Sequence, residues 1–192
     1  GRLGKVPFMR SFYLTALVLG LLTAVGPLAI NMYLPALPVI EDVFDTDTAT
    51  VQLSLLSFFV SMSLAQLIYG PLSDMFGRRL PLFIGLTLYL LGAVGSALAP
   101  DIQWLIAARA LQGLGAAAGM VIARAVIRDL YTGPQAAQLM ATLMLVVSIA
   151  PVLAPLAGSA ALAAGGWRTI FWSMAAAAIA ALVLLTTALK ET

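Results

Sequence analysis

The chain has 192 residues, of which 62% are hydrophobic and only 9% are charged, with ten Lys and Arg against eight Asp and Glu. A water-soluble domain of this size needs a far more charged surface, so the composition indicates a protein surrounded by lipid. The chain has no Cys and no His, which excludes disulfides and the commonest general base and metal ligand, and its basic residues are not clustered as a nucleic-acid site requires.

Six apolar runs reach the length of about 20 residues that crosses a bilayer core. The first run is too long for the apolar core of a signal peptide, so we expect a retained helix. Strand alternation is absent, and an all-helical chain satisfies its own backbone hydrogen bonds in lipid. We therefore predict one all-α membrane domain over 1–192, with spans at about 11–38, 50–69, 80–99, 102–124, 137–162 and 168–188.

The charged residues divide between the two ends of such a bundle. If the helices alternate in direction, eight of the ten basic residues share one end: Arg2, Lys5, Arg10, Arg78, Arg79, Arg124, Arg128 and Lys190. Five acids gather at the other end: Glu41, Asp42, Asp45, Asp47 and Asp101. Because basic loops stay inside, both termini are predicted to be cytoplasmic.

Prolines interrupt the first and fifth runs. Gly26-Pro27, Pro35 and Pro38 lie in the first, and Pro151 and Pro155 lie in the fifth. Proline removes a backbone donor, and such breaks are tolerated in membranes where neighbours or a cavity satisfy the freed carbonyls. The paired breaks favour two bent helices that line a cavity, with simple curvature as the alternative. In the fourth run, Gly115 and Gly119 predict close helix packing.

Arg109 places a permanent cation inside the fourth run. Such a residue costs about 2.5–3.5 kcal/mol near the bilayer centre and usually faces an interior or a water-filled cavity. It lies about 12 Å along its helix from Asp101, and Asn31 lies about 15 Å from Glu41. We therefore predict a similar depth for Asn31 and Arg109. Arg109 is either a polar node facing a transport path or a staple that bonds Asn31 and backbone carbonyls.

No Asp or Glu lies inside any predicted span. Proton coupling requires a group that titrates within the membrane, usually a carboxylate. Asn31 cannot titrate, so this segment holds no evident proton carrier.

Three motifs resemble those of the major facilitator superfamily. The first is the loop motif between helices two and three, G-x-L-x-D-x-x-G-R-[RK], which is matched by Gly70, Leu72, Asp74, Gly77, Arg78 and Arg79. Arg109 with Gln112 and Gly113 resembles the helix-four motif R-x-x-Q-G. The stretch 150–158 resembles the helix-five antiporter motif through Pro151, Pro155 and Gly158. Met32 to Pro38 and Lys190-Glu191-Thr192 resemble the bicyclomycin- and chloramphenicol-resistance branch of bacterial drug–proton antiporters.

The resemblance implies a fold and several residue roles. The chain would be the amino-terminal half of a fold of two six-helix halves, itself built from two three-helix inverted repeats. A cytoplasmic charge cluster would latch the outward-facing state against the other half: Gly70, Asp74, Gly77, Arg78 and Arg79. A turn that only sets topology is the alternative. Asn31 stands where the branch typically has an acid, so Asn31 and Arg109 mark the coupling position.

The implied function is multidrug efflux by alternating access in the bacterial inner membrane, without enzymatic activity, cofactor or metal, and with a proton as the family's coupling ion. Helices one, two, four and five would line the path with Asn31, Tyr33, Phe58, Met62, Arg109, Met120, Met140 and Met144, because flexible Met-rich surfaces suit varied ligands. Substrates would be amphipathic, neutral or cationic drugs. The partners would be the bilayer and a second half, in the same protein, a separate chain or a homodimer.

Two other functions stay open. The bundle could be an assembly module that transports nothing by itself, or an exporter of sugars or other small metabolites. A membrane-embedded enzyme would need a nucleophile and a base within reach, and the sequence offers no such pair.

Overall fold

The computed structural model describes residues 5–188, with side chains from 12 to 187. Arg2 and the Lys190-Glu191-Thr192 segment lie outside the described residues. The elements are α1 (Lys5–Asn31), the short 3₁₀ helix η1 (Leu34–Ala36), α2 (Leu37–Val43), α3 (Thr48–Phe76), α4 (Arg79–Ala97), α5 (Ile102–Leu130), α6 (Gly133–Gly165) and α7 (Trp167–Ala188).

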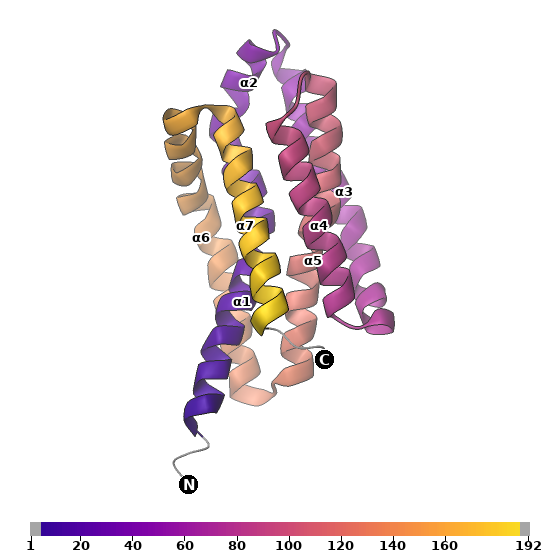
Figure 1. Cartoon of the computed structure of the whole chain (residues 1–192), viewed down its shortest axis with the longest axis vertical. Helices are drawn as coiled ribbons and strands as arrows, with labels where there is room; N and C mark the ends of the chain where they lie inside the picture. Colours follow the sequence, from indigo (N-terminus) through magenta and orange to yellow (C-terminus); the bar gives the residue numbers. More distant parts are fainter. Residues whose placement is uncertain (1–4, 189–192) are drawn as a thin grey trace.

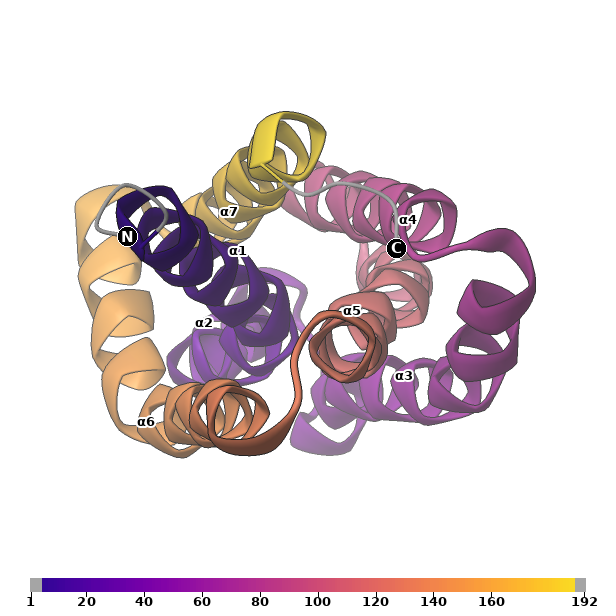
Figure 2. The same cartoon turned by 90° about the horizontal axis from the view of Figure 1, so that it is seen from below.

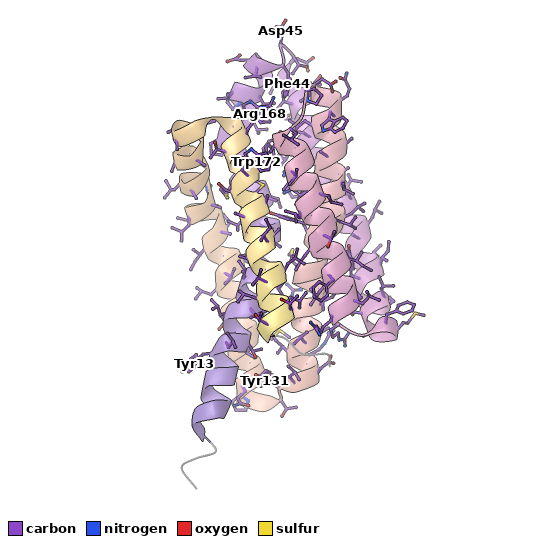
Figure 3. All side chains as sticks on the ribbon, viewed as in Figure 1. Tyr13, Phe44, Asp45, Tyr131, Arg168 and Trp172 are labelled. Atoms are coloured by element: carbon purple, nitrogen blue, oxygen red, sulfur yellow. The ribbon has the colours of Figure 1, made fainter. Side chains whose placement is uncertain are left out.

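The prediction of six spans in an all-α fold is confirmed. Within the described residues, six helical segments are long and apolar enough to cross a membrane, with α1, η1 and α2 together forming the first. The helices run side by side, and the turns that connect them lie at the two ends of the bundle (Figure 1). Asp45 and Arg168 lie at one end, and Tyr13 and Tyr131 lie at the other (Figure 3). α1 begins and α7 ends toward the end that holds Tyr131 (Figures 1 and 3).

The helices pack as two related groups of three. α5 packs against α3 and α4, while α1 packs against α6 and α7, and Figure 2 shows both groups end-on. If the first three spans are matched in order with the last three, α1 corresponds to α5, α3 to α6 and α4 to α7. The α3–α5 contact then corresponds to the α6–α1 contact, and the α4–α5 contact corresponds to the α7–α1 contact. Because α1 and α5 run in opposite directions, this exchange relates two inverted three-helix units.

The boundary of the second span differs from the prediction. We expected it to end near residue 69, with a charged loop at 70–79, but α3 continues to Phe76 with Pro71 inside it. Only Gly77 and Arg78 separate α3 from α4. The helix ends at Gly77 because this residue adopts φ 86°, a left-handed conformation that favours glycine. The polar residues at 73–74 therefore lie on the last turns of a helix.

The first span breaks later than Pro27 suggests. α1 passes through Pro27 and ends at Asn31, and the chain resumes as η1 with Pro35 near its start. Tyr33, within this break, and Ala36, the last residue of η1, are fully buried. In the fifth span, α6 stays continuous through Pro151 and Pro155, and it changes direction along its length in Figure 2. The prediction of two bent helices thus holds for the first span, which is broken, whereas the fifth span shows the simple curvature that was the alternative.

The acidic end owes part of its charge to helix caps. The carboxylates of Asp47 and Asp101 accept hydrogen bonds from the backbone N–H groups of Thr50 at 2.7 Å and Trp104 at 2.8 Å. Such caps satisfy orphan amides and favour the positive end of the helix dipole. Hydrogen bonds from Thr50 hold the pKa of Asp47 below its ordinary value.

At the same end, Arg168 joins the start of α7 to the end of α4. Its guanidinium donates to the carbonyl oxygens of Ala97 at 2.6 Å and Ala99 at 3.1 Å, and it lies 4.3 Å from the centre of the Trp167 ring. Carbonyls at a helix C-terminus attract cations. This contact accounts for a lone basic residue among the acids.

The core is built on close backbone approaches. A Cβ on Gly115 would lie 2.1 Å from the carbonyl oxygen of Gly85, and one on Gly119 would lie 2.1 Å from that of Leu22. These glycines therefore seat α5 directly against α4 and α1, as the small-residue spacing predicted.

Candidate substrate path and charge cluster

Arg109 is the largest fully buried side chain of the bundle. Its Nη2 donates to the carbonyl oxygen of Ala29 on α1 at 2.9 Å, and its Nη1 donates to Oε1 of Gln112 at 2.9 Å. In the end of α1, Met32 still donates to Leu28 at 3.0 Å, but the next bond in the series, from Tyr33 to Ala29, is not formed. Arg109 therefore caps a carbonyl that the break in the first span leaves open.

Aromatic rings enclose the same guanidinium. Its central carbon lies 4.4 Å from the ring centre of Tyr33, 4.5 Å from that of Phe58 and 5.8 Å from that of Phe171. Ring faces attract a desolvated cation. The Tyr33 hydroxyl is in turn hydrogen bonded to Ser54, which fixes the ring from α3. No carboxylate pairs with Arg109 among the described residues, so backbone, amide and rings hold the cation.

Asn31 lies beside this node without bonding it. Its Nδ2 donates to the carbonyl oxygen of Pro27 at 3.0 Å, within the last turn of α1. The expectation that Asn31 itself bonds Arg109 is therefore replaced by a contact two residues earlier, at Ala29. Arg109 therefore contacts the first span within one helix turn of Asn31, as the similar depth of the two residues predicted. The predicted bonding to a backbone carbonyl is observed at Ala29.

The charge cluster at the other end joins three helices. Arg78, between α3 and α4, donates to Oδ1 of Asp74 at 2.7 Å and to Oγ of Ser73 at 2.6 Å. It also forms a two-point contact with Asp129 near the end of α5, with Nε to Oδ2 at 2.7 Å and Nη2 to Oδ1 at 3.1 Å. Its hydrogen bonds to these acids, those to Asp129 above all, raise the pKa of Arg78 above its ordinary value.

The other cluster residues have separate positions. Arg79 begins α4 and lies 5.4 Å from the centre of the Phe83 ring, and Gly70 is half-buried within α3. Sequence reasoning missed Asp129, which is distant in the chain. The signal available was an acid next to Arg128 at the end of the fourth span, which alternation places at the same end as Arg78.

Asp129 is expected to contribute more to stability than Asp74. The Asp129 side chain is 29% exposed and makes two bonds to Arg78, whereas Asp74 is 67% exposed and makes one. Asp129→Asn should cost on the order of 1–2 kcal/mol of stability, and Asp74→Asn clearly less. Thermal unfolding of the two variants in detergent measures this order, and equal unfolding temperatures would contradict it.

Six of the eight predicted path residues fall into two groups, one around Arg109 and one at a separate cavity. Tyr33 and Phe58 surround Arg109, with Asn31 beside them. Met140 and Met144 of α6 line a separate cavity of about 260 Å³, together with Thr23, Arg124, Leu143 and Val147. Met62 is buried in the core, and Met120 is half-buried near Gly26. Their roles in transport stay predictions. Sequence reasoning did not select Phe171, Thr23 or Arg124.

The helix-five motif meets the break in the first span. A Cβ on Gly158 would lie 2.2 Å from the carbonyl oxygen of Met32, so the absence of a side chain there lets α6 contact the non-helical backbone. Pro155 is half-buried and Pro151 is exposed. Of the three motif residues, Gly158 makes this close approach.

The chain is similar to named bacterial resistance proteins. It is 33% identical over 87% of its length to a chloramphenicol resistance protein of Pseudomonas aeruginosa, covering 40% of that protein. It is 31% identical over 95% of its length to a bicyclomycin resistance protein homolog of Haemophilus influenzae, covering 46%. The chain is also 41% identical over 92% of its length to the uncharacterized MFS-type transporter YdgK of Bacillus subtilis, covering 44% of that protein. The chain thus spans less than half the length of these relatives.

The solved structures agree on the fold. The crystal structure of the human organic anion transporter MFSD10 superposes with a TM-score of 0.78 at 19% identity, over 94% of this chain and 48% of that one. The sequence profile of the Major Facilitator Superfamily matches residues 19–192. The profile match agrees with the motifs at 70–79 and 109–113, and the structural match agrees with the six-span bundle. The chain therefore belongs to the Major Facilitator Superfamily.

Proposed function

We propose that this chain is the amino-terminal half of a secondary transporter that exports amphipathic drugs across the bacterial inner membrane by alternating access. Membership of a transporter family and similarity to proteins named for chloramphenicol and bicyclomycin resistance support drug export. The proposed partners are a second six-helix half and a small drug, with both termini of this half in the cytoplasm.

The observation that carries the proposal is the discontinuous first span with a buried cation at its break. An ionisable residue within the membrane usually serves function, and transporters form their sites where broken helices expose backbone groups. Here Arg109 on α5 bonds the open carbonyl of Ala29 on α1. A substrate or coupling event that displaced Arg109 from Ala29 would loosen α1 from α5. The loss of this single bond would change the packing of both helices.

Transport tests this proposal directly. Inside-out vesicles that contain the full-length transporter should take up radiolabelled chloramphenicol or ethidium at a faster initial rate than vesicles that lack it. Equal initial rates for both compounds with and without the transporter, with the protein present and correctly inserted, would contradict drug export.

Residue 31 is proposed to be the position at which proton coupling is silenced. The Asn31 amide donates to Pro27 and cannot exchange a proton. In the same vesicles, we expect an imposed proton gradient to change wild-type uptake by less than about twofold. Asn31→Asp should introduce a titrating carboxylate beside Arg109 and make uptake strongly gradient-dependent. If Asn31→Asp leaves the gradient dependence unchanged, this account of residue 31 is wrong.

A further inference from the structure

A second polar site lies well away from Arg109. The cavity between α1, α5 and α6 is about 260 Å³ in volume and is lined by Thr23, Arg124, Met140, Leu143, Met144 and Val147. Arg124 follows Arg109 by fifteen residues on α5, which is about 22 Å along the helix axis. The cavity therefore belongs to the half of the bundle that holds Tyr13 and Tyr131.

Arg124 is an unusual cation in this bundle. Its side chain has no hydrogen bond or ion pair with the described part of the chain, although it lies six residues before the end of α5 at Leu130. By contrast, Arg78 bonds two carboxylates, and Arg168 bonds two carbonyl oxygens. Arg124 is exposed and lines one wall of the cavity, and a cation there with no counter-charge among the described residues attracts an anion.

Thr23 adds a second, independent observation. It is 2% exposed and lines the same cavity, yet its Oγ1 has no hydrogen-bond partner within the described chain. A buried hydroxyl without a partner is destabilising, so such groups usually have a protein or ligand partner. Pro27 also brings no amide hydrogen to the carbonyl of Thr23, its ordinary partner in a helix. Thr23 thus presents unused polar groups beside a positive charge.

The rest of the cavity wall is apolar and adaptable. Met140 and Met144 supply flexible thioether side chains, and Leu143 is almost completely buried. Methionines fit irregular apolar groups. The volume is below that of a typical site for a whole drug-sized ligand, so it suits one anionic arm with an adjoining apolar part.

We propose that this cavity binds the anionic group of an amphipathic organic anion. The Arg124 guanidinium pairs with the carboxylate or sulfonate, the Thr23 hydroxyl donates a second hydrogen bond, and Met140 and Met144 contact the apolar portion. An anionic lipid headgroup presents the same chemistry. The binding site stands on the cavity alone, whereas treating its ligand as cargo rests on the proposed export function.

Two matched fluorescent probes test the site in the full-length transporter in detergent. Anilinonaphthalene sulfonate is an amphipathic anion, and phenylnaphthylamine has a similar ring system without the charge. Arg124→Gln should weaken sulfonate binding by at least about tenfold, and Thr23→Val by a few-fold. Both variants should leave binding of the neutral probe within about twofold. Arg128→Gln is the control and should change neither, because Arg128 lies one turn further along α5 and is exposed like Arg124 but does not line the cavity.

Several outcomes decide the proposal. It is overturned if Arg124→Gln leaves sulfonate binding unchanged, or if it weakens both probes equally. Arg124→Lys keeps the charge and should retain part of the sulfonate binding, so loss in both variants with a lowered unfolding temperature would indicate a structural role and also overturn it. Short-chain phosphatidylglycerol, with phosphatidylcholine as its zwitterionic control, separates the sources: competition that depends on Arg124 indicates a lipid headgroup, and lack of competition indicates a free anion.

Failure of the anion site and failure of the proposed export function can be told apart. If the vesicles export drug while sulfonate binding does not depend on Arg124, the anion site is wrong and drug export stands. If sulfonate binding depends on Arg124 while no drug is exported, the anion site stands and the export function is wrong.

Discussion

Replacing Arg109 with Met is expected to reduce drug export at least tenfold while leaving the amount of folded protein in the membrane nearly unchanged. The substitution removes the one bond that satisfies the open carbonyl of Ala29 among the described residues, and it removes the cation that three rings enclose. Removing a buried charge also removes its desolvation cost, which offsets part of the lost bonding. We therefore expect a small effect on stability and a large one on transport, measured by vesicle uptake and by thermal unfolding in detergent.

Arg109→Lys is the informative companion to this change. Lysine keeps the positive charge but lacks the planar fork that reaches Ala29 and Gln112 together and stacks on the rings. Export should therefore fail in this variant too. If Arg109→Met transports drug normally at normal expression, the node has no part in transport. If it loses transport and stability in the same proportion, Arg109 is only a staple between α1 and α5.

Gly158→Ala is expected to give the second large effect. The added Cβ would lie 2.2 Å from the carbonyl oxygen of Met32 and 2.9 Å from its carbonyl carbon. Backbone atoms cannot rotate aside as a side chain does, so α6 must move away from the break in the first span. Such overpacking costs about 1–3 kcal/mol. Both the unfolding temperature in detergent and the rate of drug uptake should fall.

Gly20→Ala is the matched control because Gly20 lies on α1 and faces α6. Its Cβ would meet only Cγ2 of Val146, at 3.9 Å, an ordinary van der Waals contact. Alanine favours a helix over glycine, so this variant should be as stable as the wild type or slightly more so. Equal behaviour of the two variants would show that the contact between α6 and Met32 is unimportant.

Hydropathy predicted the six spans well because a bilayer imposes a minimum length on each apolar run. Residue spacing also predicted that Arg109 would reach the first span at the level of Asn31. The actual partner, Ala29, was not predictable, because it depends on where the helix unwinds. Pro35 and its neighbours favour a break, but their sequence does not determine which carbonyl is left open.

The end of α3 and the pairing of residues distant in the chain could not be predicted from the sequence, because both depend on how the helices pack. Ser73 and Asp74 follow Pro71 and favour turns by themselves. In the structure they lie within α3, which ends only at Gly77. The Arg78–Asp129 pair joins residues 51 positions apart, and only the packing of α3 and α4 against α5 brings them together. The cavity at Arg124 likewise requires three helices to be placed at once.

The central claim is that this chain crosses one membrane six times, with the acidic turns and the turns near the chain termini on opposite sides. The chain has no Cys, so single cysteines can be introduced without background. Asp42 in α2 and Thr132 between α5 and α6 are both exposed. A membrane-impermeant maleimide should label Asp42→Cys in intact cells and Thr132→Cys only in inside-out vesicles. Labelling of both positions from the same side would contradict the topology and the transport path built on it.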